Sequence, residues 1–241
     1  MNDFQENIIP ALGQNDANVF LYENENSLIR ILFVGNSISK HAPKPSVGWH
    51  NDCGMAASCT ENDYVHLIMK RIIEKYDHNA SFGIAQAAKY ARTFFDKTPE
   101  DDYSLARKFN ADIVLIFYGA NVPKDYDSME APPKTFERAY RDMRNYLSRD
   151  GEAVVLHSMG FYIRPKLEEE KLVSIKEYND TYIDIDDIRR LPESHGMFNH
   201  PGDLGMQMIA DRFLEYLEPE IEKILAKKFE ISQVKKAPHH D

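Results

Sequence analysis

The sequence has only two cysteines, Cys53 and Cys59, among 241 residues, which excludes a fold held together by several disulfides. No apolar run approaches the roughly 20 residues needed to span a bilayer, so a transmembrane helix is not expected. Basic residues are also too few to balance the acidic ones, since 29 Lys and Arg stand against 39 Asp and Glu and the net charge is −10. Proteins that bind nucleic acid or anionic lipid need the opposite balance. We therefore expect neither nucleic acid nor a membrane as a partner.

The N-terminal region also lacks the features of a signal peptide. Residues 1–25 contain no Lys or Arg and no long apolar centre. As given, the chain is expected to be cytoplasmic, although a chain from which a signal peptide had been removed would look the same. We divide it into an N-terminal arm (1–28) with one edge strand (18–22), a main domain (29–228) and a loose tail (229–241). The sequence leaves the oligomeric state open.

Short apolar runs, typical of buried strands, alternate with segments whose apolar residues have helical spacing. Strands are expected at 30–35, 80–85, 112–118, 153–157 and 181–185, and helices at 61–76, 87–95, 99–109, 136–147, 164–178 and 201–227. The run IVLIFY at 113–118 is apolar throughout, as in a central parallel strand that is covered on both faces. The alternation predicts an α/β fold with a parallel sheet between layers of helices.

Three polar residues follow strands or precede the last helix of this arrangement. Ser37 follows the first main strand, Asn121 follows the strand at 112–118, and His200 stands just before the final helix. Because the carboxyl ends of parallel strands lie together, these side chains are expected to converge. A serine nucleophile needs a base, which is usually histidine, and an asparagine amide can donate to the oxyanion formed on an acyl carbon. The alternatives are structural: a serine helix cap, an asparagine turn and a His-Pro turn.

The same residues resemble sequence blocks of the SGNH (GDSL-type) hydrolases. GNSIS at 35–39 is similar to the first block, Gly119-Ala120-Asn121 to the third, and HPGDLG at 200–205 to the fifth, in the right order. The loop sequence GWHNDCGMAAS, followed by DYVHL, also resembles the corresponding segment in a subgroup of bacterial SGNH proteins. The resemblance implies a flavodoxin-like three-layer sandwich with about five mainly parallel strands. It implies hydrolysis of small acyl esters, often acetyl groups on a carbohydrate, with Ser37 as nucleophile, His200 as base, Asn121 in the oxyanion hole and no cofactor.

The sequence departs from this family in the residue expected to orient the base. Met197 stands three residues before His200, where the family usually has Asp. Glu193 is the nearest upstream carboxylate and is our tentative acid. The other candidates are Asp186, Asp187, Asp203 and a backbone carbonyl, the last of which would leave a Ser–His dyad.

A second departure concerns the glycine that supplies an oxyanion donor in the family's second block. Gly83 is the nearest glycine, but it lies within the expected strand at 80–85. The turn Gln86-Ala87 is better placed, because it follows that strand. The backbone N–H of Ala87 is therefore the tentative second donor, beside that of Ser37.

The segment 41–60 is too long for an ordinary connection and too rich in aromatic and varied residues for a disordered linker. We expect an ordered loop beside Ser37, with Trp49 as a wall of the substrate site and His50 and Asp52 as polar neighbours. The alternative is that Trp49 only packs the loop onto the domain. Its His, Asp and Cys residues match no common zinc spacing, so no metal is expected.

The sequence thus supports two functions of different classes. The first is a serine esterase acting on small acyl esters, including a saccharide ester. The second is a non-catalytic protein of the same fold that binds a carbohydrate or acyl ligand, and its motivation is the methionine at position 197.

Overall fold

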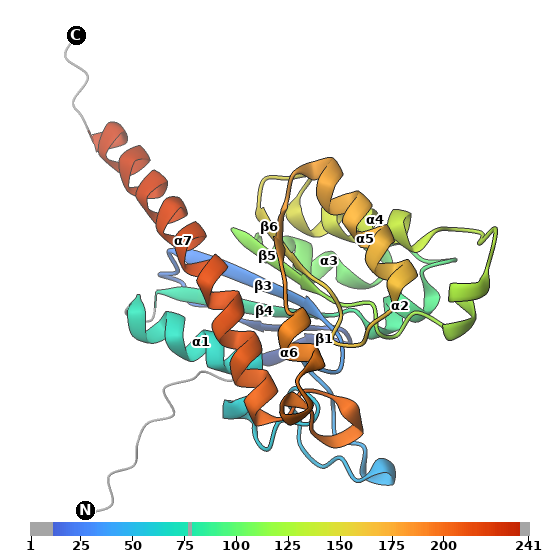
Figure 1. Ribbon diagram of the computed structural model, residues 1–241. Coiled ribbons are helices and arrows are strands. Elements are labelled where there is room, and N and C mark those ends of the chain that lie inside the picture. The colour runs from blue at the N-terminus through green and yellow to red at the C-terminus, as the bar shows by residue number, and fades with distance from the viewer. Residues whose placement is uncertain (1–11, 77–78, 237–241) are drawn as a thin grey trace, which may run out of the picture.

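The computed structural model describes residues 12–76 and 79–236, which build one seven-stranded sheet flanked by helices (Figure 1). The strands are β1 (Gly13–Asp16), β2 (Val19–Tyr22), β3 (Ile29–Gly35), β4 (Ala80–Gln86), β5 (Ile113–Phe117), β6 (Val154–Ser158) and β7 (Thr181–Ile183). Their order in the sheet is β1-β2-β4-β3-β5-β6-β7, and the five strands from β4 to β7 in that order are parallel. The predicted α/β class and the five main strands are confirmed.

Helices cover both faces of this sheet. They are α1 (Tyr64–Lys75), α2 (Ala88–Thr93), α3 (Glu100–Lys108), α4 (Phe136–Ser148), α5 (Pro165–Tyr178), α6 (Asp186–Arg190) and α7 (Asp203–Lys236). Figure 1 shows α1, α6 and α7 on one face and α2 to α5 on the other. Side chains of β3 alternate between the faces, so that Ile31 and Phe33 join the core under α1 and α7 while Leu32 and Val34 join the opposite core. This double coverage explains why β5 is apolar without interruption.

Residues 12–28 are part of the sheet rather than a separate arm. The expected edge strand exists as β2, but it lies inside the sheet because it pairs antiparallel with β4 on one side and with β1 on the other. Val19 and Leu21 are buried in the core on the face of α2 to α5. Residues 1–11 of the predicted arm lie outside the described residues.

The last helix is longer than predicted. It begins at Asp203, two residues after Pro201, and continues to Lys236, so the loose tail predicted from residue 229 is wrong as far as the described chain reaches. The segment FEISQVKK at 229–236 holds no glycine or proline that would end a helix. Residues 237–241 lie outside the described part. No helix in that part is long and apolar enough to cross a membrane.

The start of α1 anchors the long loop at 41–60. Residues Thr60–Asn62 form a 3₁₀ turn and Asp63 is the N-cap, accepting from the backbone N–H of His66 at 2.9 Å. The buried Asp63 carboxylate also accepts from the backbone N–H of Gly54 at 2.9 Å. One carboxylate therefore fixes both the helix start and the loop that reaches the carboxyl edge of the sheet.

Candidate active site

Ser37 is positioned by a tight turn at the carboxyl end of β3. The carbonyl of Asn36 accepts hydrogen bonds from the backbone N–H groups of Ser39 and Lys40, at 3.0 and 3.1 Å. The turn brings Ser39 so close to Gly35 that a Cβ on residue 35 would lie 1.7 Å from the Ser39 hydroxyl oxygen. Glycine is needed here because of this close approach. The result is a rigid turn that presents Ser37 above the sheet.

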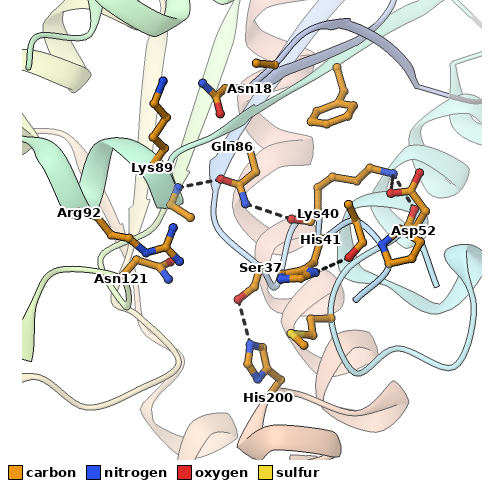
Figure 2. A pocket seen from close by; sticks show the side chains of 16 residues that line it. Asn18, Ser37, Lys40, His41, Asp52, Gln86, Lys89, Arg92, Asn121 and His200 are labelled. Carbon is orange, nitrogen blue, oxygen red and sulfur yellow. Dashed lines mark hydrogen bonds and ion pairs between the residues drawn. The ribbon is translucent and has the colours of Figure 1, made fainter. Parts of the chain in front are cut away.

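The hydroxyl of Ser37 meets the imidazole of His200. Its Oγ lies 2.9 Å from His200 Nε2, within hydrogen-bond distance (Figure 2). In the described part of the chain, the backbone N–H of Ser37 has no hydrogen-bond acceptor. The pair therefore has the geometry in which a histidine can take the proton of a serine, with a free N–H on the same residue.

The other ring nitrogen of His200 faces two uncharged groups. His200 Nδ1 lies 2.6 Å from the Tyr162 hydroxyl and 3.2 Å from the backbone carbonyl of Phe198. A carbonyl can only accept, so it favours a proton on Nδ1 and leaves the Nε2 lone pair for the Ser37 hydroxyl. The Tyr162 hydroxyl can then accept from Nδ1 while it donates to the Phe198 carbonyl, 3.4 Å away.

An unusual backbone turn aims the Phe198 carbonyl at the ring. Phe198 and Asn199 both have left-handed φ values, 58° and 59°. Hydrogen bonds from Gly196 N–H to the His200 carbonyl at 2.7 Å, and from His200 N–H to the Met197 carbonyl at 3.1 Å, close the turn. The segment from residue 186 to residue 199, between the expected strand at 181–185 and the final helix, consists of α6 and two 3₁₀ turns (Pro192–Ser194 and Met197–Asn199).

The electrostatic surroundings of His200 favour its neutral form. Burial lowers the pKa of the His200 imidazole below its usual value of 6.5, and the hydrogen bond to the Phe198 carbonyl opposes this only in part. Within the described residues no carboxylate contacts the ring. The imidazole is therefore able to accept a proton at neutral pH.

Asn121 follows β5 and lines the same cavity as Ser37 and His200. Gly119 precedes it with φ of 135°, a conformation that favours glycine, and a Cβ there would lie 3.3 Å from the Lys171 side chain. The Oδ1 atom of Asn121 is buried without a hydrogen-bond partner, and its side chain makes no hydrogen bond within the described residues. The amide is thus free to bind a ligand group in the cavity.

The cavity has a volume of about 580 Å³ and is walled by three segments that are far apart in the sequence. The β1–β2 hairpin contributes Asn18 and Phe20, and the loop after Ser37 contributes Lys40, His41 and Asp52. The third wall consists of Gln86, at the end of β4, with Lys89 and Arg92 on α2. The sequence analysis placed the Gln86-Ala87 turn at the site, but it did not assign the hairpin, Lys89 or Arg92 to the cavity. The signal for Lys89 and Arg92 was available, because residues 86–92 follow a parallel strand just as Asn121 does.

Trp49 and His50 are not at this cavity. Trp49 is only 4% exposed and packs in the core under α1 and α7, and its ring N–H donates to the His41 carbonyl at 3.3 Å. His50 is exposed and does not line the cavity, whereas Asp52 does. The structure therefore corrects the expected substrate-binding role of Trp49 and His50, because burying the indole is what fixes the loop to the domain.

The backbone N–H of Ala87, the tentative second oxyanion donor, already makes a hydrogen bond to the neighbouring strand β3. The backbone N–H of Ala87 donates to the carbonyl of Gly35 at 2.5 Å, and that of Ala88 to the Gln86 side chain at 2.8 Å. Gly83 lies inside β4, packed against Leu21 and Leu32. The N–H groups of Ala87 and Ala88 are thus engaged, whereas that of Ser37 has no acceptor within the described residues.

None of the carboxylates proposed to orient His200 contacts its imidazole ring within the described residues. Glu193 is exposed in a 3₁₀ turn and makes no contact with the ring. The remaining candidates are bound elsewhere: Asp186 to Arg189 and Arg190, Asp187 to Arg212, and Asp203 to Ser58 and Asn62. Of the alternatives left open by the sequence, the structure brings only a backbone carbonyl to Nδ1. Tyr162 was not foreseen. The described residues contain no group of His, Cys, Asp and Glu side chains that could hold a metal ion.

Comparisons with known proteins agree with this architecture. No family model and no curated protein matches the sequence. Among solved structures, a protein described as a GDSL-like lipase from Bacteroides ovatus is 16% identical, with a TM-score of 0.52, over 80% of this chain and 99% of its own. A GDSL-like lipase from Bacteroides uniformis is 14% identical, with a TM-score of 0.54, over 82% and 100%. A family two carbohydrate esterase from Clostridium thermocellum, in complex with cellohexaose, is 16% identical, with a TM-score of 0.53, over 84% and 67%.

These identities are low, so the likeness concerns the fold. The two GDSL-like lipases superpose on about four fifths of this chain, whose described residues form a seven-stranded, mostly parallel sheet with helices on both faces. The chain has the fold of the SGNH (GDSL-type) hydrolases.

Proposed function

We propose that this protein is a serine esterase that hydrolyses small acyl esters. The observation that carries the proposal is the 2.9 Å distance between Ser37 Oγ and His200 Nε2 at the wall of an open cavity. In the reaction, His200 takes the Ser37 proton while Ser37 attacks the ester carbonyl. His200 then passes that proton to the departing alcohol. A water molecule, activated by the same imidazole, releases the acyl group and regenerates Ser37.

Two donors support an oxyanion hole in this mechanism. The Asn121 side chain lines the cavity without a partner of its own, and the Ser37 backbone N–H has no acceptor within the described residues. Unpaired donors near a nucleophile are worth most when charge develops on the carbonyl oxygen in the transition state. We therefore assign both to the tetrahedral intermediate.

The lining of the cavity favours a short acyl group and a hydroxyl-rich alcohol. Its apolar residues are mostly small, such as Ala42, Pro43 and Ala88, and offer little surface for a long acyl chain. Its polar residues, including Asn18 and Gln86, suit hydrogen bonds to sugar hydroxyls. The compared carbohydrate esterase in complex with cellohexaose agrees with a saccharide ester as substrate.

The experiment compares 4-nitrophenyl acetate hydrolysis by the wild type, Ser37→Ala and Glu193→Gln, with labelling by a fluorophosphonate. We expect Ser37→Ala to lose turnover and labelling, and Glu193→Gln to keep both, because Glu193 does not contact His200. Ser104→Ala, on the exposed side of α3, is the matched serine control. A wild type that neither turns over nor becomes labelled would refute the esterase.

The second candidate is a non-catalytic protein that binds a carbohydrate or acyl ligand. The observation in its favour is that the described residues place no carboxylate on His200. Uncharged hydrogen-bond partners, here the Tyr162 hydroxyl and the Phe198 carbonyl, stabilise the imidazolium less than a carboxylate does, which lowers the rate of proton transfer. Saccharide binding without any turnover or labelling of Ser37 is the result that this alternative predicts.

A further inference from the structure

The charge of the active-site cavity is opposite to that of the whole protein. Three cationic side chains, Lys40, Lys89 and Arg92, line it, against the single carboxylate of Asp52 among its described lining residues. The chain as a whole has a net charge of −10. A positive cavity in an acidic protein attracts negatively charged ligands to one place and leaves the rest of the surface repulsive to them.

Two of the three cations are already neutralised by neighbours. Lys40 Nζ lies 2.8 Å from the Asp52 carboxylate, and Lys89 Nζ lies 2.8 Å from that of Asp102. Arg92 has neither an ion pair nor a side-chain hydrogen bond with any described residue. In the view of Figure 2 its side chain extends from α2 toward Asn121, on the same side of the cavity as the proposed oxyanion donor. The unpaired guanidinium thus lies where the substrate would bind.

We propose that Arg92 binds a carboxylate on the alcohol part of the ester, so that the substrates are acyl esters of acidic sugars such as uronates. This inference rests on the proposed function. A guanidinium presents two parallel N–H donors that match a carboxylate. One unpaired cation balances a monoanion, whereas a phosphate dianion would call for a second free cation, and Lys40 and Lys89 are both engaged.

An exposed, unpaired arginine is common on protein surfaces, and this chain provides its own comparison. Arg138 on α4 is also exposed and has no side-chain partner among the described residues, but it lies outside the active-site cavity. If unpaired arginines only add general charge, Arg92→Gln and Arg138→Gln must affect catalysis alike. If Arg92 binds substrate, only its replacement changes the preference for anionic esters.

The kinetic experiment uses two acetyl esters of nearly the same shape, 4-acetoxybenzoate and its neutral methyl ester. The quantity measured is the ratio of their kcat/KM values, because each ester's intrinsic reactivity cancels when this ratio is compared between variants. We expect Arg92→Gln to reduce the ratio about tenfold, the range of a charge-assisted hydrogen bond. Arg92→Glu should reduce it further, Arg138→Gln should leave it unchanged, and added salt should lower the wild-type ratio because the site is exposed.

A ratio that Arg92→Gln leaves within twofold of the wild type would overturn the proposal. A larger Arg92-dependent preference for 4-acetoxyphenyl phosphate would overturn the choice of a carboxylate. If the wild type hydrolyses no ester, the proposed function fails, and calorimetric binding of D-glucuronate and D-glucose decides the inference separately. Glucuronate binding that weakens about tenfold in Arg92→Gln would support it, and equal binding of the two sugars would overturn it.

Discussion

Replacing Tyr162 by phenylalanine tests how the catalytic imidazole is held. The Tyr162 hydroxyl lies 2.6 Å from His200 Nδ1, and its ring packs edge-on against the imidazole with the ring centres 5.4 Å apart. Phenylalanine keeps the ring contact and removes only the hydroxyl. Burial raises the pKa of Tyr162, so the hydroxyl stays neutral over the working pH range. It acts on His200 as a hydrogen-bond partner without charge.

The expected magnitude follows from the change in His200 during catalysis. In the resting state Nδ1–H is a neutral donor, whose hydrogen bond contributes about 0.5–1.5 kcal/mol, and in the transition state it belongs to an imidazolium, where such bonds contribute about 1.5–3 kcal/mol. The difference, about 1 to 1.5 kcal/mol, corresponds to roughly a tenfold lower kcat. The Phe198 carbonyl at 3.2 Å remains as an acceptor and limits the loss. KM should change little, because Tyr162 does not line the cavity.

The assay is the pH profile of 4-nitrophenyl acetate hydrolysis by the wild type and Tyr162→Phe. Losing an acceptor destabilises the charged imidazole, so the acid limb of the variant should move to lower pH as kcat falls. Tyr182→Phe is the control, because that hydroxyl makes only a 3.4 Å contact with Asp184. An unchanged kcat and pH profile would show that Tyr162 is only a packing residue. A higher kcat would show that its hydroxyl donates to Nδ1 and holds the unproductive tautomer.

Four further outcomes follow from the same geometry. Because burial lowers the pKa of His200, kcat/KM of the wild type should rise with pH through a pKa below 6.5 and then stay level, and an acid limb above 6.5 would contradict this. Asn121→Ala should lower kcat about 100- to 1000-fold with a small change in KM, measured with 4-nitrophenyl acetate, if its amide stabilises the oxyanion. Gly35→Ala would place a Cβ 1.7 Å from the Ser39 hydroxyl oxygen, so it should destabilise the protein by about 1–3 kcal/mol, seen as a lower Tm in thermal unfolding. Met197→Asp should raise kcat for 4-nitrophenyl acetate less than about threefold, because residue 197 is 47% exposed and Nδ1 of His200 already has two hydrogen-bond partners. A tenfold higher kcat than that of the wild type would refute this.

The strands that position the site could be predicted because their signals are local. Both β3 and β5 are largely apolar runs with a glycine and a polar residue at or just after their carboxyl ends, which is a pattern typical of a buried parallel strand. β1, with the sequence GQND, has no such signal because its pairing with β2 depends on backbone hydrogen bonds. Trp49 was assigned to the cavity from its residue type alone, and the sequence does not say which surface buries an indole. Position in the sheet could therefore be predicted, whereas the direction of a loop side chain could not.

The same distinction holds within the site. The rule that the carboxyl ends of parallel strands lie together predicts that Ser37 and Asn121 share a cavity with His200, and all three line it. It does not predict the partners of Nδ1. Tyr162 comes from the loop after β6, and the Phe198 carbonyl reaches the ring because Phe198 and Asn199 both adopt left-handed backbone. Asn favours this conformation, but Phe does not, so the residue types alone do not predict the turn.

The turn before His200 is strained, because Phe198 and Asn199 have left-handed backbone conformations. A left-handed non-glycine residue costs roughly 1–2 kcal/mol, and Phe198 has no side-chain hydrogen bond to offset it. The turn is nonetheless over-determined, since Gly196 bonds the His200 carbonyl at 2.7 Å and packs so closely that a Cβ there would lie 2.9 Å from Gly202. Strain retained in this way is common at functional sites, and here its product is a carbonyl aimed at the imidazole. A carbonyl stabilises the imidazolium less than a carboxylate would, which slows proton transfer, but it also leaves the pKa of His200 low. Under the proposed function, supporting the imidazole by the Phe198 carbonyl thus exchanges some catalytic rate for a base that stays unprotonated at lower pH than one paired with a carboxylate.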